Sequence, residues 1–342
     1  MALKLFSKLS VRAVAVVGLA SSLIACSPES PKLVELPLVK KERVKNTGDN
    51  KVTFNRAVDI LFVVDDSGSM AIHQQNLSKN IQAFTQGFMA NQMLDFHIGS
   101  VTSSMESSWS TTTCYAFGGE LIGCPKYVER STPNGTSVLE KNLNPGTGGS
   151  GNEEFFSPIR SALSAPLVNG KNAGFYRQDA YLAVIFLTDS DDQSSESAQD
   201  IYNFLLNLKG GDAAKIITYG VYIPTNVSSC DRSGEPEPKK LEALFKIASG
   251  KTLGLCDADY GKKLAALGDD LVRRVGSVLY LTRPADPATI TVAYGSQIIP
   301  NDPQTGWIYD PSRNALVFGP DIDLKPEPPG TQVEVDFIAA EY

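Results

Sequence analysis

The first pattern in this chain is a series of nearly continuous apolar runs, which lie at residues 58–64, 181–187 and 216–223. Runs of this length are typical of strands that are buried on both faces of a sheet, and a further strand is predicted at residues 96–101. Between the strands, apolar residues recur at the spacing of amphipathic helices, over residues 77–88, 201–208, 241–248 and 264–275. Strands that alternate with helices predict an α/β domain, with a doubly wound, mostly parallel sheet and helices on both faces.

A second pattern begins after Arg283-Pro284, where short alternating segments replace the long apolar runs. Residues 290–294 and 333–337 alternate between apolar and polar side chains, and Pro, Gly and Asn turns separate the segments. Such short strands predict a small β-rich module. We therefore expect an α/β domain over residues 53–283 and a C-terminal β module over residues 284–342.

The first 25 residues have the features of an export signal. Lys4, Lys8 and Arg12 precede an apolar run at residues 13–24, which is too short to cross a bilayer comfortably. This segment is therefore expected to be a targeting signal and not part of the fold.

The apolar run ends in the sequence Leu-Ile-Ala-Cys, whose cysteine is Cys26. This ending resembles the bacterial lipobox, and an ordinary signal peptide with a chance cysteine is the alternative. The resemblance implies that residues 1–25 are removed and that Cys26 becomes the lipid-bearing first residue. Ser27 follows the cysteine, which in the Gram-negative families that this signal resembles favours the outer membrane. We expect a lipid-anchored protein of the cell envelope, on the periplasmic or the outer surface.

Residues 26–52 link the expected lipid to the expected domain. They contain three prolines and a basic cluster at residues 40–45. This composition indicates a flexible tether. The basic cluster is expected to be a solvated part of the linker, with contact to anionic lipid headgroups as the alternative.

The net charge of the chain is −7, and without the leader, which holds three basic residues and no acidic one, it becomes −10. Nucleic-acid binding depends largely on the neutralisation of phosphates by basic side chains. An acidic protein of this kind is therefore not expected to bind nucleic acid.

Four cysteines remain once Cys26 is assigned to the lipid. An even number of cysteines in an exported protein predicts two disulfides. Of the three possible pairings we favour Cys114–Cys124 and Cys230–Cys256, because each closes a local loop. A zinc site is the alternative, although none of the spacings is the short CxxC kind.

Candidate metal-binding side chains follow the end of the first apolar run. The run at residues 58–64 leads directly into Asp65, Ser67 and Ser69, and a helical pattern follows. A hard cation such as Mg²⁺ takes oxygen ligands in near-octahedral geometry and keeps several waters. One carboxylate and two hydroxyls at alternating positions on a tight turn can converge on such an ion, and Gly68 permits the turn. The alternative is that these residues only cap the following helix.

This DxSxS pattern is similar to the metal-ion-dependent adhesion site of von Willebrand factor A domains, and the resemblance covers residues 53–280. It implies a bound Mg²⁺, with Mn²⁺ or Ca²⁺ as alternatives, and an aspartate at the end of another strand. Asp189 follows the run at residues 181–187 and matches that position, with a helix cap as its alternative role. The family also supplies a threonine from a Gly-rich loop, for which Ser150 and its rival Thr147 are the candidates.

Three more carboxylates lie next to these ligands in the sequence, at Asp66, Asp191 and Asp192. A cation would relieve the repulsion among the acidic groups that crowd this end of the sheet. For Asp66 the alternative is exposure to solvent, and for Asp191 and Asp192 exposure to solvent is the expected role.

The resemblance implies adhesin-like binding, in which an acidic residue of a partner protein completes the coordination of the ion. The alternative is a structural or scaffolding envelope lipoprotein in which the metal only stabilises the fold, and a metal-dependent hydrolase is a third possibility. We expect no catalytic residues and no enzyme activity. The chain has only two histidines, His73 and His97, and it lacks a GxSxG nucleophile elbow.

Overall fold

We describe the protein from a computed structural model. The structure describes residues 43–44, 57–90, 94–106, 109–110, 113–225, 230, 234–257, 259–276, 278–319, 322–325, 327–328, 331 and 333–340. The leader, Cys26 and nearly all of the expected tether lie outside these residues. Within them, no helix is long and apolar enough to cross a membrane.

The α/β domain is built on a sheet of six strands in the order β4-β3-β2-β5-β6-β7. All neighbouring strands are parallel except β3 and β4, which are antiparallel. The predicted fold class, a mostly parallel sheet with helices on both faces, is confirmed. The strands are β2 (Ala57–Val64), β3 (Asp95–Thr102), β4 (Tyr127–Val128), β5 (Tyr181–Thr188), β6 (Ile216–Tyr222) and β7 (Lys251–Gly254).

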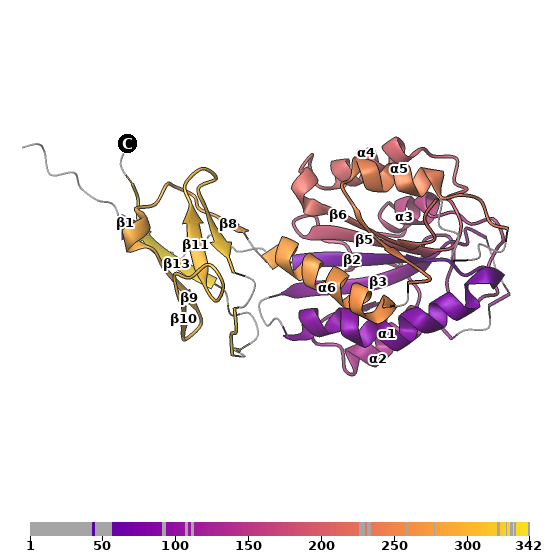
Figure 1. The fold of residues 1–342 in the computed structure, drawn as a ribbon, viewed down its shortest axis with the longest axis horizontal. Coiled ribbons are helices and arrows are strands. Elements are labelled where there is room, and N and C mark those ends of the chain that lie inside the picture. Colours follow the sequence, from indigo (N-terminus) through magenta and orange to yellow (C-terminus); the bar gives the residue numbers. More distant parts are fainter. Residues whose placement is uncertain are drawn as a thin grey trace, which may run out of the picture. The chain divides into compact units, whose positions relative to one another are not determined.

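Three helices cover each face of this sheet (Figure 1). One face carries α1 (Ala71–Ala90), α2 (Gly135–Asn142) and α6 (Tyr260–Gly276), and the other carries α3 (Phe156–Ala162), α4 (Ala198–Leu208) and α5 (Lys239–Ile247). The short 3-10 turns are η1 (Gly68–Met70), η2 (Ala213–Lys215) and η3 (Pro287–Thr289).

Strand β2 shows why the apolar runs are continuous. Successive side chains of a strand point to opposite faces of the sheet. Ile60 and Phe62 therefore join the core under α1 and α6, whereas Leu61 and Val63 join the core under α3, α4 and α5. Both faces are covered by helices, so both sets of positions are apolar except for buried Asp59, whose carboxylate accepts from Arg177.

The strand order reverses beside β2, and this reversal positions the candidate site. From β2 the chain passes to β3 on one side of it, and the later strands β5, β6 and β7 extend from its other side. Val64, the last residue of β2, is paired with Thr102 on one side and Leu187 on the other. In such sheets ligands bind outside the carboxyl ends of the strands at the point of reversal.

The C-terminal strands form two small antiparallel sheets that share one apolar core. One sheet has the order β1-β13-β9-β10 and the other β11-β12-β8. Two of these strands precede residue 284: β8, which pairs with β12, and β1, which lies within the expected tether and pairs with β13. The strands are β1 (Arg43–Val44), β8 (Val278–Tyr280), β9 (Thr291–Tyr294), β10 (Gln297–Ile299), β11 (Trp307–Asp310), β12 (Ala315–Phe318) and β13 (Val333–Ile338).

Candidate metal centre

Asp65 follows β2 directly, and its side chain has no exposed surface. Its backbone N–H donates to the carbonyl oxygen of Leu187 at 2.9 Å. Its carboxylate accepts two more bonds, at Oδ1 from the backbone N–H of Ser67 (2.9 Å) and at Oδ2 from the hydroxyl of Thr188 (2.8 Å). These bonds fix the carboxylate between the ends of β2 and β5.

Two serine hydroxyls connect the turn after β2 to the aspartate after β5. The Oγ atoms of Ser67 and Ser69 lie 3.0 Å apart, and the Ser69 hydroxyl donates to Oδ1 of Asp189 at 3.1 Å. The structure thus brings together the four residues Asp65, Ser67, Ser69 and Asp189. Their oxygens meet at the point where the strand order reverses.

The alternative capping roles of these residues do not fit the local geometry. Ser67 precedes η1, but its side chain makes no capping hydrogen bond. Asp189 is followed by irregular chain, and the next helix, α4, is capped by Ser197 in a capping box with Asp200. The polar side chains at the strand ends are therefore not explained by helix capping.

Sequence reasoning missed a further carboxylate, that of Glu153, on the loop that precedes α3. Only 1% of its surface is exposed, and its Oε2 atom has no hydrogen-bond partner within the described residues. Burial raises the pKa of Glu153, and the charges of Glu235 and Asp189 raise it further, while the hydroxyls of Ser190 and Ser67 oppose the shift. The resemblance implied a hydroxyl in this loop, and no local pattern marks Glu153 as buried.

The other carboxylates of the site are also destabilised as anions. Burial, together with the charges of Glu153 and Asp189, raises the pKa of Asp65 well above its usual range. Burial raises the pKa of Asp189 as well. Within the described part of the chain, no basic side chain forms an ion pair with these three acids, and Lys240 pairs with Asp192 instead, at 2.5 Å. This end of the sheet therefore has buried negative charge that the described protein does not neutralise.

The site fits a hard divalent cation, because its donors are carboxylate and hydroxyl oxygens. No group of three or more Asp, Glu, His or Cys side chains among the described residues converges closely enough to hold a metal by itself. A cation here would therefore be held by the hydroxyls of Ser67 and Ser69 together with the acidic groups around them.

Gln74 is a second residue that sequence reasoning missed. Its Nε2 donates to the carbonyl oxygens of Asp65 (2.7 Å) and Gly146 (2.9 Å), so it ties the turn after β2 to the Gly-rich loop. It is one turn into α1 and almost fully buried. No local sequence pattern distinguishes it from a polar helix residue that faces solvent.

The Gly-rich loop at residues 146–151 does not bring its predicted ligands into contact with the other four. The Ser150 hydroxyl accepts from the backbone N–H of Asn152 at 3.0 Å, and the Ser150 backbone N–H donates to Ser104 Oγ at 2.8 Å. None of the hydrogen bonds described for Ser150 or Thr147 reaches Asp65, Ser67, Ser69 or Asp189. The choice between Ser150 and Thr147 stays a prediction.

Asp66 is buried and holds two loops together. Its carboxylate accepts from the hydroxyls of Ser103 (3.0 Å), Ser104 (2.9 Å) and Tyr115 (2.6 Å). Its carbonyl oxygen accepts from the backbone N–H of Gly149 at 2.8 Å, and a Cβ at Gly149 would lie 2.2 Å from the Asp66 carboxyl carbon. Glycine is needed there because the loop lies directly against the carboxylate. Asp66 is thus part of the support of the site.

Asp191 and Asp192, which we expected to face solvent, instead bind the first residues of two helices. Oδ1 of Asp192 accepts from the backbone N–H groups of Phe155 (2.8 Å) and Phe156 (3.0 Å), where α3 begins. Oδ1 of Asp191 accepts from the N–H groups of Lys240 (3.0 Å) and Leu241 (3.1 Å), near the start of α5. The expectation was wrong because the free N–H groups of a helix start attract carboxylates from other loops.

Both predicted disulfides are present. Cys114 and Cys124 are joined within the loop between β3 and β4, with their Cα atoms 5.9 Å apart. Cys230 and Cys256 join the segments that follow β6 and β7, with a Cα–Cα distance of 5.6 Å. Because these four cysteines are bonded in pairs, they do not form the alternative zinc site.

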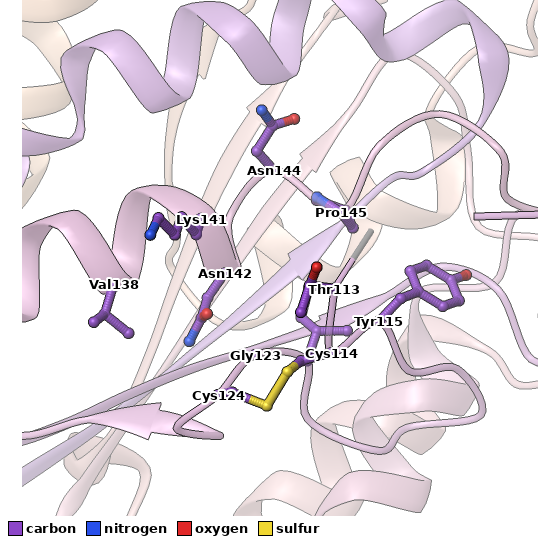
Figure 2. Close-up of a pocket in the computed structure, with 11 residues that line it drawn as sticks. Thr113, Cys114, Tyr115, Gly123, Cys124, Val138, Lys141, Asn142, Asn144 and Pro145 are labelled. Carbon is purple, nitrogen blue, oxygen red and sulfur yellow. A yellow bond between two sulfur atoms is a disulfide. The ribbon is translucent and has the colours of Figure 1, made fainter. Parts of the chain in front are cut away.

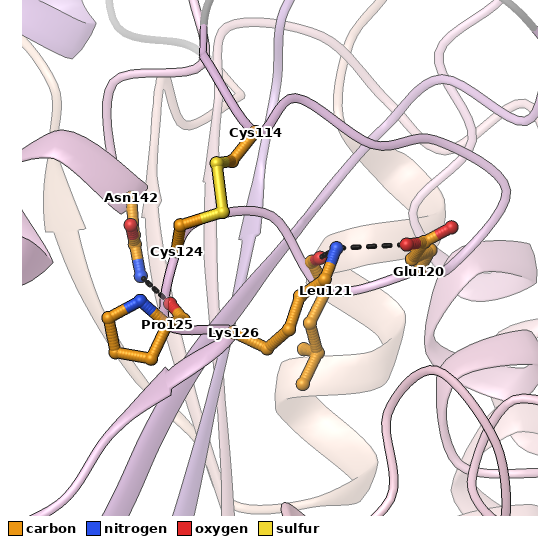
Figure 3. The surroundings of a disulfide bond; sticks show 7 residues. All are labelled: Cys114, Glu120, Leu121, Cys124, Pro125, Lys126 and Asn142. Atoms are coloured by element: carbon orange, nitrogen blue, oxygen red, sulfur yellow. Dashed lines mark hydrogen bonds and ion pairs between the residues drawn. A yellow bond between two sulfur atoms is a disulfide. The ribbon is translucent and has the colours of Figure 1, made fainter.

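The loop around the first disulfide is tied by further contacts (Figure 3). The Lys126 ammonium donates to the Glu120 carboxylate at 2.9 Å and to the Leu121 carbonyl oxygen at 2.6 Å. The Asn142 side chain, at the end of α2, donates to the Pro125 carbonyl oxygen at 3.1 Å. These bonds tie together parts of the long connection between β3 and α3.

A pocket of about 500 Å³ lies beside this disulfide, next to α2 (Figure 2). Its described lining contains no carboxylate and no histidine. Tyr115 belongs both to the pocket wall and to the hydrogen bonds around Asp66. The lining residues are Thr113, Cys114, Tyr115, Ile122, Gly123, Cys124, Val138, Lys141, Asn142, Asn144 and Pro145.

Comparison with known proteins gives only distant structural likenesses. No protein-family model and no curated protein sequence matches the chain. Among solved structures it is similar to a von Willebrand factor type A protein from Catenulispora acidiphila (13% identity, 83% of this chain, 58% of that chain, TM-score 0.38). It is also similar to the pilus adhesin SpaC from Lactobacillus rhamnosus GG (12% identity, 82% of this chain, 38% of that chain, TM-score 0.40).

A third similar structure is proximal thread matrix protein 1 from the mussel byssus, in a form described as having a zinc-occupied MIDAS motif. The identity is 12%, the match covers 67% of this chain and 50% of that chain, and the TM-score is 0.37. This chain thus spans between 38% and 58% of the length of the three similar structures. Because these TM-scores are low, the proposals below rest on the geometry of the site.

Proposed function

We propose that this protein is a lipid-anchored protein of the cell envelope that binds a partner protein through a divalent cation. The observation that carries the proposal is the path of hydrogen bonds that joins buried Asp65 to Asp189 where the strand order reverses. The N–H of Ser67 donates to Asp65, the hydroxyls of Ser67 and Ser69 are bonded to each other, and the Ser69 hydroxyl donates to Asp189. No described basic side chain neutralises these acids, and hard oxygen donors of this kind suit Mg²⁺, with Mn²⁺ or Ca²⁺ as alternatives.

The chain's own residues have distinct roles in this proposal. Ser67 and Ser69 supply neutral oxygens, and Asp65 and Asp189 supply charge from two different strands. The bond from Thr188 holds Asp65 in its orientation, and Gln74 holds the turn. An acidic residue of the partner completes the coordination of the ion.

Two exposed apolar side chains flank the candidate site and favour protein binding. Trp109 is 92% exposed, and its backbone N–H donates at 2.9 Å to the carbonyl oxygen of Gly148, next to the residue that binds Asp66. Ile72 is 62% exposed and is the second residue of α1, just after the turn that carries Ser67 and Ser69. Exposed large apolar groups at one end of a domain are typical of surfaces that meet another protein.

Isothermal titration of the full chain with Mg²⁺ and Mn²⁺ tests the cation site. The wild type is expected to bind one ion, and Asp65→Ala is expected to bind none. The same heat from both proteins, or no heat from the wild type, would remove the metal site from the proposal.

Partner binding is tested by capture of envelope or host-cell proteins on the immobilised protein. Capture is expected with Mg²⁺ present and is expected to be lost with EDTA or with Asp65→Ala. Trp109→Ala should keep the ion and lose the partner. The matched control is Ile298→Ala, since Ile298 is also an exposed apolar residue (80%) but belongs to β10 of the C-terminal module. Capture that is unchanged by EDTA would contradict the proposal.

A second candidate function is a scaffold in which the cation only stabilises the fold. The buried carboxylate of Glu153 favours it, because an ion that already has three carboxylates from its own chain attracts a partner's carboxylate less. In that case chelation would lower the melting temperature and leave every captured protein bound. Under the first function, chelation releases the partner from a protein that stays folded.

The lipid anchor is part of the proposal and depends on Cys26, outside the described residues. Mass spectrometry of the mature protein is expected to show a lipid-modified Cys26 as the first residue. An unmodified N-terminus at another position would contradict the lipid anchor but would not affect the proposed cation site.

A further inference from the structure

We propose that Glu153 is the third carboxylate ligand of the cation, in the loop where the sequence led us to expect a hydroxyl from Ser150 or Thr147. This inference rests on the cation site of the proposed function, because it concerns the same ion. A third carboxylate favours the second candidate function, in which the cation stabilises the fold, over coordination that a partner's carboxylate completes. It changes the charge of the site, and with it the ion that the site prefers.

Burial without a partner is the first reason. Glu153 is 1% exposed, and its Oε2 atom has no hydrogen-bond partner among the described residues. A buried carboxylate is costly unless a charge or hydrogen bonds compensate it. The described chain supplies no cationic side chain for Glu153, and a bound cation would compensate its charge.

The second reason is the place of Glu153 among the other ligands. Of the charges that act on Asp65, that of Glu153 is the strongest, ahead of Asp189. The hydroxyls of Ser67 and Ser190 interact with the Glu153 side chain. The Glu153 side chain therefore lies near Ser67, one of the two serines that we propose as ligands of the ion.

The third reason is that the backbone holds Glu153 in place. Its carbonyl oxygen accepts from the N–H of Gln193 at 2.9 Å, and the N–H of Glu154 donates to the carbonyl oxygen of Ser103 at 3.1 Å. The next N–H, that of Phe155, donates to Asp192 at 2.8 Å. Hydrogen bonds on both sides of Glu153 fix the position of its backbone. The fixed backbone places the side chain in its buried position.

The hydroxyl of Ser150 has a partner within its own loop. Ser150 Oγ accepts from the backbone N–H of Asn152, which closes a turn there. Among the described residues, Asp65, Glu153 and Asp189 do not form a three-carboxylate metal group by themselves, so the proposed coordination includes the hydroxyls of Ser67 and Ser69.

Three carboxylates and two hydroxyls give the site a formal charge of −3. Mg²⁺ keeps several waters and is usually bound through one or two carboxylates, whereas Ca²⁺ accepts six to eight oxygen ligands in flexible geometry. We therefore expect the site to bind Ca²⁺ more tightly than Mg²⁺.

Calorimetry on the full chain with Ca²⁺ and with Mg²⁺ tests the role of Glu153. Glu153→Gln keeps the size of the side chain and is expected to lower the Ca²⁺ affinity by more than about tenfold, the effect seen even for residues that only orient ligands. The matched control is Glu154→Gln. Glu154 is the next residue of the same loop, but its carboxylate is half-exposed and bonded to Asn152. The control is expected to bind Ca²⁺ like the wild type.

Thermal unfolding gives a second readout, in which the effect of Glu153→Gln on the melting temperature depends on the presence of Ca²⁺. In EDTA, Glu153→Gln is expected to melt at or above the wild-type temperature, because it removes a buried, uncompensated carboxylate. In saturating Ca²⁺ it is expected to melt below the wild type. A Glu153 with only a structural role would lower the melting temperature equally in both conditions. Glu153→Asp, which keeps the charge, should recover part of the Ca²⁺ stabilisation.

The outcomes separate this inference from the proposed function. If the wild type binds no divalent cation, the proposed function fails and this inference fails with it. If the wild type and Asp65→Ala differ as expected but Glu153→Gln binds Ca²⁺ like the wild type, only the role of Glu153 is overturned.

Discussion

The hydroxyl of Thr188 donates a hydrogen bond of 2.8 Å to Oδ2 of Asp65, and this bond joins the carboxyl ends of two neighbouring parallel strands. Thr188 is the last residue of β5 and is fully buried. Its Oγ1 also accepts from the backbone N–H of Ser190 at 2.8 Å. Thr188 thus orients one proposed ligand of the cation and shapes the loop that carries another, Asp189.

Thr188→Val should weaken cation binding without removing any ligand. The variant has nearly the same shape but leaves Oδ2 of Asp65 without its donor, so we expect a loss of about tenfold in affinity. The free energy of unfolding should fall by about 1–3 kcal/mol. Calorimetry and urea unfolding measure the two effects.

The matched control for this variant is Thr218→Val. Thr218 lies on β6, is equally buried, and its hydroxyl has no hydrogen-bond partner in the described structure. This variant should leave both cation affinity and stability near the wild-type values. Equal losses in the two variants would mean that the Thr188 bond has no special role.

Tyr115→Phe should loosen the loops around the site and leave the ion in place. The Tyr115 hydroxyl is 2.6 Å from Oδ2 of buried Asp66, and a bond to a charged acceptor contributes about 1.5–3 kcal/mol. We expect the free energy of unfolding to fall by about that amount in urea titrations. Tyr202→Phe on α4 is the control, because the side chain of Tyr202 packs against apolar residues. Unchanged stability of Tyr115→Phe would contradict the role given to Asp66.

The two disulfides should differ in their contribution to stability. Cys230–Cys256 closes a loop of 26 residues and Cys114–Cys124 one of 10. In the chain-entropy account these correspond to about 3.5 and about 2.7 kcal/mol. Replacing both cysteines of a pair by serine should therefore cost more for Cys230–Cys256. Urea unfolding compares the variants, and peptide mapping under non-reducing conditions checks the pairing; a crossed pairing would refute it.

Lys209 should make stability depend on pH in the alkaline range. Its ammonium is buried, donates to the carbonyl oxygen of Arg177 at 2.8 Å and lies 4.3 Å from the centre of the Tyr176 ring. Burial lowers the pKa of Lys209 to about 8, from 10.5 for the free side chain. Between these two values the unfolded chain binds more protons than the folded one, so stability increases as the pH rises.

The measurement is urea unfolding at pH 7.5 and pH 9.5 for the wild type and Lys209→Met. The wild type should gain about 1–2 kcal/mol relative to the variant between the two conditions. Below pH 8 the lysine is charged in both the folded and the unfolded state. The difference in the free energy of unfolding between the wild type and Lys209→Met should therefore not change with pH there. A difference that stays constant from pH 7.5 to pH 9.5 would show that Lys209 does not titrate in this window.

The sequence alone predicted the sheet and the four polar residues that the fold brings together at its end. The apolar runs at residues 58–64 and 181–187 can be buried on both faces only inside a parallel sheet covered by helices. Each run ends in an acidic turn, and parallel strands place those ends at one edge. Asp65, Ser67, Ser69 and Asp189 were therefore predictable from local pattern. The two disulfides were predictable because each pair closes a short stretch of chain.

Only the tertiary structure decided which other polar residues are buried. Asp66, Asp192, Gln74 and Glu153 look in sequence like any solvent-facing residue of a loop or helix. The burial of Asp66 and Asp192 depends on partners 36 or more residues away, such as Ser103 for Asp66 and Phe156 for Asp192. Periodicity shows which face of one element is apolar, but it carries no information about which distant N–H or hydroxyl will meet a side chain. The middle-loop ligand was expected to be a hydroxyl because the family resemblance implies one, and the burial of Glu153 is seen only in the folded chain.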